Sequence, residues 1–87
     1  MEFNKDGKID RYYNLDEILK LDLDEEIKQN IKEKFGKKVF FDSNGSCKVG
    51  RLCGVEKNYK LTMIYYIVAD SEDKKMFVPV NQSITLL

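Results

Sequence analysis

The hydrophobic period of this chain changes once, at Gly36, and the change divides the sequence into a helical part and a strand-forming part. Before Gly36, one stripe of apolar residues recurs at every fourth position: Leu23, Ile27, Ile31 and Phe35. This spacing is typical of a helix that packs one face on a core. After Gly36, short runs alternate between apolar and polar residues, as β-strands do. The sequence therefore predicts an α+β fold in which the helices come first.

The helical segment, residues 14–35, contains two start signals. Glu17 lies three residues after Asn14, and Glu25 lies three residues after Asp22, so both pairs have the form of a capping box. Two helices are expected from these signals. A single bent helix over 15–35 is the alternative.

Turn-forming residues divide the rest of the chain into five expected strands, at 38–42, 46–56, 61–69, 74–78 and 83–87. A hairpin is expected at Ser43-Asn44-Gly45, where Gly45 readily takes a positive φ. Gly50 and Gly54 predict a bulge or a strong bend in the second strand. Pro79 cannot donate to a ladder, so the chain should leave the sheet there in one 3₁₀ turn. We expect a strongly bent, five-stranded antiparallel SH3-like small barrel, because an open sheet of this size leaves long unpaired edges.

With 87 residues, the chain is expected to form one domain: a polar lead-in over 1–13, the helical segment over 14–35 and the barrel over 37–87. The expected core consists of strand residues with a roof of helical residues. The strand residues are Val39, Phe41, Leu52, Met63, Ile64, Ile67, Val78 and Ile84, and the roof is Ile27, Ile31 and Phe35.

A helix followed by five strands is also the layout of Sm and Hfq proteins, which residues 23–87 resemble. The pattern Gly45-x4-Gly50-x-Leu52-x-x-Val55-Glu56 is similar to their first motif, whose strand ends in an acidic residue. Two positions depart from the family pattern. Lys60 stands where Sm proteins place an Asn for base recognition, and Val80-Asn81 stands where they carry Arg-Gly. The resemblance implies a small barrel, and RNA binding and ring assembly would accompany it.

The composition argues against an enzyme. The chain has no His, so the commonest general base and metal ligand are missing, and no phosphate loop or nucleophile–base pair is recognisable. The segment from Glu2 to Asp10 looks like the start of a calcium loop, but its closing position is Tyr13 rather than a carboxylate. We expect no catalytic residue, no metal and no cofactor. A small binding module fits this composition.

Basic residues are concentrated in 37–60, which holds six basic and two acidic side chains. These six basic residues, together with Tyr59, are suited to a rim that contacts phosphates and stacks on a base: Lys37, Lys38, Lys48, Arg51, Lys57 and Lys60. The alternative is that these lysines solvate strand edges and discourage edge pairing.

Arg51 is a second candidate for partner binding. Even spacing is expected to place it on one strand face with Cys47, Val49, Cys53 and Val55. A lone cation on such a face is explained if it reaches the barrel rim and meets an acidic group of a partner. The two cysteines lie roughly 20 Å apart along an extended strand, too far for a disulfide, so we expect free thiols.

The adjacent aromatic residues Tyr12 and Tyr13 are a third candidate site. In an extended segment, the two side chains cannot both point into a core. One of them is therefore expected at the surface, where a tyrosine can anchor a partner.

The residue usage also indicates an origin. The chain has 13 Lys, 2 Arg and one Ala, a bias typical of A/T-rich genes. We expect a protein-binding regulator or inhibitor of the type encoded by phages or other mobile elements of low-GC bacteria. A nucleic-acid-binding barrel is the alternative, and a homo-oligomer is compatible with both. No signal-like apolar segment is recognisable, and the longest apolar run, 63–69, is too short to span a bilayer, so the expected location is cytoplasmic, away from membranes.

Overall fold

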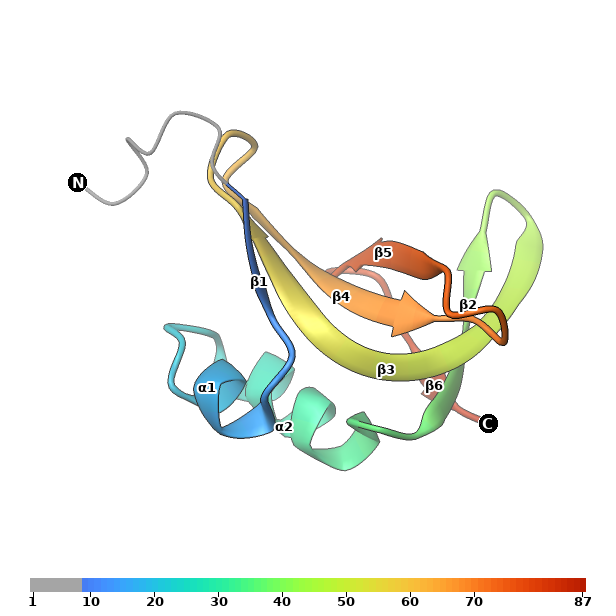
Figure 1. The fold of residues 1–87 in the computed structure, drawn as a ribbon, viewed down its shortest axis with the longest axis horizontal. Coiled ribbons are helices and arrows are strands. Elements are labelled where there is room, and N and C mark those ends of the chain that lie inside the picture. Colours follow the sequence, from blue (N-terminus) through green and yellow to red (C-terminus); the bar gives the residue numbers. More distant parts are fainter. Residues whose placement is uncertain (1–8) are drawn as a thin grey trace.

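The computed structural model describes residues 9–87, which form two helices and one bent sheet of six strands (Figure 1). In chain order the elements are β1 (Ile9–Tyr12), α1 (Leu15–Leu19), α2 (Glu25–Lys34), β2 (Lys38–Ser43), β3 (Ser46–Asn58), β4 (Met63–Ala69), β5 (Lys75–Pro79) and β6 (Thr85–Leu86). The α+β class predicted from the change of period is confirmed.

The two helices begin in different ways. At α1, the Asn14 side chain accepts hydrogen bonds from the backbone N–H groups of Asp16, at 2.9 Å, and Glu17, at 3.3 Å, as an N-cap should. At α2, the N-cap is Asp24, which makes no side-chain capping bond. The start expected at Asp22 is therefore wrong by two residues.

The helical segment ends where it was predicted to end. Lys32 and Lys34 occupy the last turn of α2, where positive charge complements the helix dipole. Gly36 follows with a φ of +78°, a left-handed conformation that glycine adopts without strain. Within α2, the Asn30 amide donates to the Tyr66 hydroxyl of β4 at 2.9 Å and so joins helix to sheet.

The sheet is antiparallel, and β3 is its longest strand. The strand order is β5-β4-β3-β2-β6, and β1 pairs separately with β3. The first half of β3 pairs with β2, its last residues pair with β1, and β4 lies along the opposite edge. Figure 1 shows β3 as a wide bow with both helices on its convex side. Over the described residues the sheet has six strands and is not closed.

β1 corrects the expectation that residues 1–13 form a polar lead-in, of which 1–8 lie outside the described residues. Ile9 pairs with Asn58, and Tyr12 pairs with Val55. The physical reason is the length of β3: β2 pairs only as far as Arg51, and the rest of that edge would otherwise carry unpaired backbone groups.

One other boundary differs from the predicted one. β3 continues to Asn58, so the connection to β4 is the short turn at 59–62 rather than a loop from residue 56. After β5, the backbone N–H of Gln82 donates to the Pro79 carbonyl at 2.9 Å, an i→i+3 bond that agrees with the single turn expected there.

Glycines set the curvature of β3 and its turn, as predicted. Asn44 and Gly45 form a two-residue hairpin loop with φ angles of +52° and +81°. A bulge interrupts the β3–β4 register between Leu52 and Gly54. A Cβ atom added to Gly50 would lie 2.6 Å from Val68 Cγ1, so the sheet can bend tightly only with glycine at this position.

The bulge also changes which β3 residues point toward the helices. Leu52 and Val55 are both fully buried in the core, although they are an odd number of positions apart. Cys53 is the extra residue of the bulge, without a register partner on β4, and it shifts the inward–outward alternation of the residues that follow it by one position. Val55 therefore does not share a face with Arg51, and the even-spacing expectation is wrong at Val55, although Cys53 does line the same groove as Val49 and Arg51.

The core lies between the helices and the sheet face that they cover. Most expected members are buried in it: Val39, Phe41, Leu52, Val78, Ile84 and Ile31. Ile67 is buried as well, but it lies outside this cluster. Ile64, Ile27 and Phe35 are partly buried against the cluster, whereas Met63 is only half-buried and lies outside it. Leu23 of the apolar stripe is also buried, and the buried residues that were not expected include Ile18, Val55, Tyr66 and Val68. Among the described residues, no helix is long and apolar enough to cross a membrane.

Candidate binding surface

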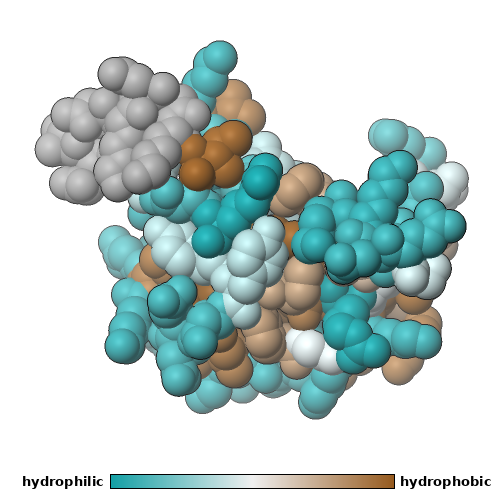
Figure 2. Space-filling view, in the orientation of Figure 1, coloured by the Kyte–Doolittle hydropathy of each residue, from teal (hydrophilic) through white to brown (hydrophobic). Residues whose placement is uncertain are grey.

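The sheet has one face that the helices leave uncovered, which we call the outer face. Cross-strand pairing places its central residues in rows: Arg11 beside Glu56 and Tyr65, then Ile67 beside Phe77. Several of the exposed large hydrophobic residues lie on or beside this face: Ile9, Tyr13, Val49 and Phe77, each more than two-fifths exposed. The space-filling view shows hydrophobic surface between polar groups in the middle of the molecule (Figure 2).

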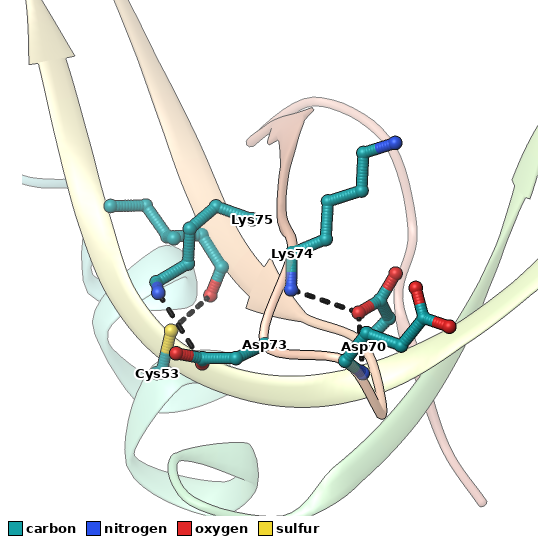
Figure 3. Close-up of polar contacts among 7 residues, drawn as sticks. Cys53, Asp70, Asp73, Lys74 and Lys75 are labelled. Atoms are coloured by element: carbon teal, nitrogen blue, oxygen red, sulfur yellow. Dashed lines mark hydrogen bonds and ion pairs between the residues drawn. The ribbon is translucent and has the colours of Figure 1, made fainter.

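The bow of β3 and the β4–β5 turn enclose a hollow of about 860 Å³, which we call the groove. Its lining is Tyr13, Lys38, Val49, Gly50, Arg51, Cys53, Ala69, Asp70, Ser71, Asp73 and Lys75. Figure 3 shows this region, with the Cys53 side chain directed from β3 toward Asp73 and Lys75 at the β4–β5 turn. Val49 of β3 gives the groove an apolar surface. Tyr13, the residue after β1, adds an aromatic side chain to its lining.

The acidic residues of the groove are engaged within the β4–β5 turn. One carboxylate oxygen of Asp70 accepts the backbone N–H groups of Glu72 and Lys74, both at 2.9 Å (Figure 3). Asp73 pairs with Lys75, whose Nζ lies 3.4 Å from Oδ1. Asp70 therefore stabilises the turn, and Asp73 pairs with Lys75.

Lys38 and Arg51 carry the remaining positive charge of the groove. They are direct cross-strand partners on β2 and β3, an arrangement in which like charges destabilise a sheet. Arg51 Nη1 donates to the Gly36 carbonyl at 2.5 Å, which fixes one side of the guanidinium. Within residues 9–87, neither Lys38 nor Arg51 forms an ion pair with a carboxylate.

Cys53 is the thiol of the groove, and its surroundings keep it protonated. Its Sγ donates weakly to the Ile67 carbonyl at 3.5 Å. Burial raises the pKa of the Cys53 thiol, and the nearby Lys75 lowers it by less. Both cysteines are free, with Cys47 exposed, as the sequence predicted. A thiol with a raised pKa is a poor nucleophile at neutral pH.

A second charged cluster lies on the outer face beyond the groove. The Arg11 Nε atom donates to Glu56 Oε1 at 2.9 Å, and the side chain of Glu56 is only 8% exposed. The Arg11 guanidinium also lies 5.2 Å from the centre of the Phe77 ring. This cluster fastens β1 to β3 and supports the exposed aromatic ring beside it.

The structure separates the binding residues expected from the sequence. Arg51 and Tyr13 line the same groove. Lys48 lies near the β2–β3 turn, opposite buried Phe41, and Tyr12 packs against the core. Neither of these two residues lines the groove.

Lys57, Tyr59 and Lys60 lie at the far end of β3, away from Arg51. The Tyr59 side chain is buried, only 6% exposed. The expectation that it is an exposed aromatic ring for stacking on a base is therefore wrong. The Lys57 ammonium lies 5.4 Å from the Tyr59 ring centre. Burial, followed by a hydrogen bond with Asp10, raises the pKa of Tyr59 to about 12. This end of β3 is a small packed unit that closes the β3–β4 turn.

Lys75 and Phe77 belong to the uncovered surface but were not expected from the sequence, whereas Lys38 was among the basic residues expected at the rim.

No family model, curated protein or solved structure matches this chain. Within residues 9–87, no cluster of His, Cys, Asp and Glu could hold a metal ion.

Proposed function

We propose that this chain is a non-enzymatic protein-binding module that acts as a regulator or inhibitor, and that the groove and the adjoining outer face are its binding surface. The observation that carries the proposal is the uncovered sheet face, where exposed Tyr13 and Val49 line one groove with Lys38 and Arg51, and exposed Phe77 lies beside Arg11. Apolar and aromatic residues surrounded by polar groups are typical of protein interfaces. The residue usage supports an origin in a phage or another mobile element of a low-GC bacterium, with action in the cytoplasm.

We also propose that the sheet is an incompletely closed SH3-like small barrel. The support is the order β5-β4-β3-β2-β6, with a bent, bulged β3 at its middle and a tight turn before the last strand. Such a frame holds binding side chains on strands rather than on mobile loops, which favours precise placement.

Nucleic-acid binding is the second candidate function, and the basic pair of Lys38 and Arg51 favours it. The burial of Tyr59 counts against it, because that ring is not presented for stacking on a base. Asp70 and Asp73 count against it as well, since they place negative charge on the opposite wall of the groove. A protein partner fits this mixture of charges better.

The test is affinity capture with two matched variants. Val49 and Leu86 are 44% and 42% exposed, but Leu86 lies on β6, opposite Val39 of the helix-covered face. Immobilised wild type, Val49→Gln and Leu86→Gln are incubated with nuclease-treated lysate of a low-GC bacterium, and bound proteins are identified by mass spectrometry. We expect a protein that wild type and Leu86→Gln retain and Val49→Gln loses.

Two results would contradict the proposal. In the first, every captured protein is retained equally by Val49→Gln. In the second, the chain binds single-stranded DNA or RNA with an affinity that falls steeply as salt rises, the signature of counterion release. The second result would favour the nucleic-acid-binding alternative.

A further inference from the structure

We infer that the groove recognises an extended segment of a partner protein that carries one acidic residue, with its carboxylate between Lys38 and Arg51 and an apolar side chain at Val49. This inference rests on the proposed function and adds the chemistry of the partner.

The charge pattern of the groove is the first step. Lys38 and Arg51 face each other across β2 and β3, and within residues 9–87 no carboxylate pairs with either one. A ligand carboxylate between them would relieve their repulsion and pair with both. The bond from Arg51 to the Gly36 carbonyl uses one of the five guanidinium donors and orients the group, so less side-chain freedom is lost on binding.

The spacing along β3 is the second step. Val49 and Arg51 are two residues apart on the same face of one strand, and Val49 is 44% exposed. Two residues of extended chain span roughly 6.7 Å. An extended peptide has the same repeat, so an acidic residue and an apolar residue two positions apart can occupy both subsites together.

The opposite wall is the third step, because it distinguishes an acidic peptide from a nucleic acid. Asp70 and Asp73 line the same groove as the two cations, and of these carboxylates only Asp73 pairs with a cation, Lys75, within residues 9–87. A polynucleotide with a charge at every residue would place phosphates against these carboxylates. A peptide with one acidic residue among neutral ones avoids that repulsion, and its neutral residues can lie against Tyr13, Cys53 and Ala69.

The experiment is a selection of random dodecapeptides displayed on yeast against the intact, immobilised chain. The selected peptides are then synthesised and titrated against three variants: Lys38→Gln with Arg51→Gln, Lys38→Gln alone, and Lys20→Gln with Lys32→Gln. The last is a control with the same loss of charge, made at exposed positions in the helical segment. Lys38→Gln alone keeps the test valid if loss of the Arg51 hydrogen bond weakens the fold.

We expect enriched peptides that carry Asp or Glu two positions from an apolar residue. We also expect about a tenfold loss of affinity in the double groove variant, a smaller loss in Lys38→Gln and no loss in the control, since each exposed pair contributes about 0.2–1 kcal/mol. No enrichment, enrichment without acidic residues, or equal binding to all variants would overturn the inference. If a captured protein still depends on Val49 in that case, the proposed function stands and only the acidic ligand is wrong.

Discussion

Gly54→Ala tests directly whether β1 packs on the bulged part of β3. A Cβ atom at this position would lie 2.5 Å from the Tyr12 carbonyl oxygen and 2.9 Å from Tyr13 Cδ1. An ordinary C···O contact is about 3.3 Å, so β1 would have to move by about 0.8 Å. The contact is with backbone, which no change of rotamer can relieve.

The magnitude follows from two opposing effects. Overpacking of this kind costs about 1–3 kcal/mol, whereas replacing Gly by Ala stabilises by about 0.4–1 kcal/mol through the entropy of the unfolded chain. We therefore expect the free energy of unfolding to fall by about 1–2 kcal/mol. Urea denaturation measures this change, and hydrogen exchange shows where it acts.

The spatial pattern of the exchange provides the control. In Gly54→Ala, the amides of β1 should lose protection while the β2–β3 hairpin keeps it. Gly50→Ala, on the same strand, meets Val68 and Ala69 instead, so its loss of protection should fall at the end of β4. Unchanged stability of Gly54→Ala with full protection of β1 would refute the packing of β1 on Gly54.

Further predictions concern the core, the thiols, the buried tyrosine and the buried ion pair. Ile31 is fully buried, so Ile31→Ala should lower the free energy of unfolding by about 2–4 kcal/mol in urea denaturation, and an unchanged midpoint would show that α2 is not docked. Exposed Cys47 should react with iodoacetamide before Cys53, whose pKa is raised by burial, and mass mapping of the first adduct would reveal the reverse order. Tyr59 has a folded pKa of about 12 and an ordinary value of 10.0, so its contribution to stability is full below pH 10 and is lost as the pH rises toward 12. Tyr59→Phe should flatten that part of the stability profile, and an unaltered alkaline profile would contradict this assignment. Arg11→Met should destabilise by about 1–3 kcal/mol because it leaves the Glu56 carboxylate buried without its partner, and a double-mutant cycle with Glu56→Gln that shows no coupling would exclude the pair.

The sequence was sufficient to predict the strands after Gly36, because turn residues and alternation are local signals. The Asn44-Gly45 turn also determines which residues of β2 and β3 face each other. A two-residue hairpin fixes its register, and counting back from Ser43 opposite Ser46 pairs Lys38 with Arg51. The basic pair of the groove could therefore have been predicted from the turn alone.

Other features depend on contacts that local patterns do not reveal. The four residues of β1 include two charged ones, and they form a strand because the edge of β3 is available to them. The bulge lies between Leu52 and Gly54, and its position determines that Val55 points inward although Arg51 points outward. The sequence does not specify that position, because Gly50 and Gly54 are compatible with a bulge at several places along the strand. Tyr59 reads as an exposed aromatic between two lysines, and only the turn that follows β3 buries it.

The pairing of β3 with three other strands has a consequence for the order of folding. The hairpins that link β2, β3, β4 and β5 join neighbouring segments and close short loops. By contrast, β1 and β6 pair with strands that are distant in the sequence, so their docking requires the closure of long loops. The four-strand meander is therefore expected to form first, and the two terminal strands are expected to open most readily in the native state. Because Tyr13 directly follows β1 and lines the groove, such opening would remove one wall of the groove without unfolding its floor.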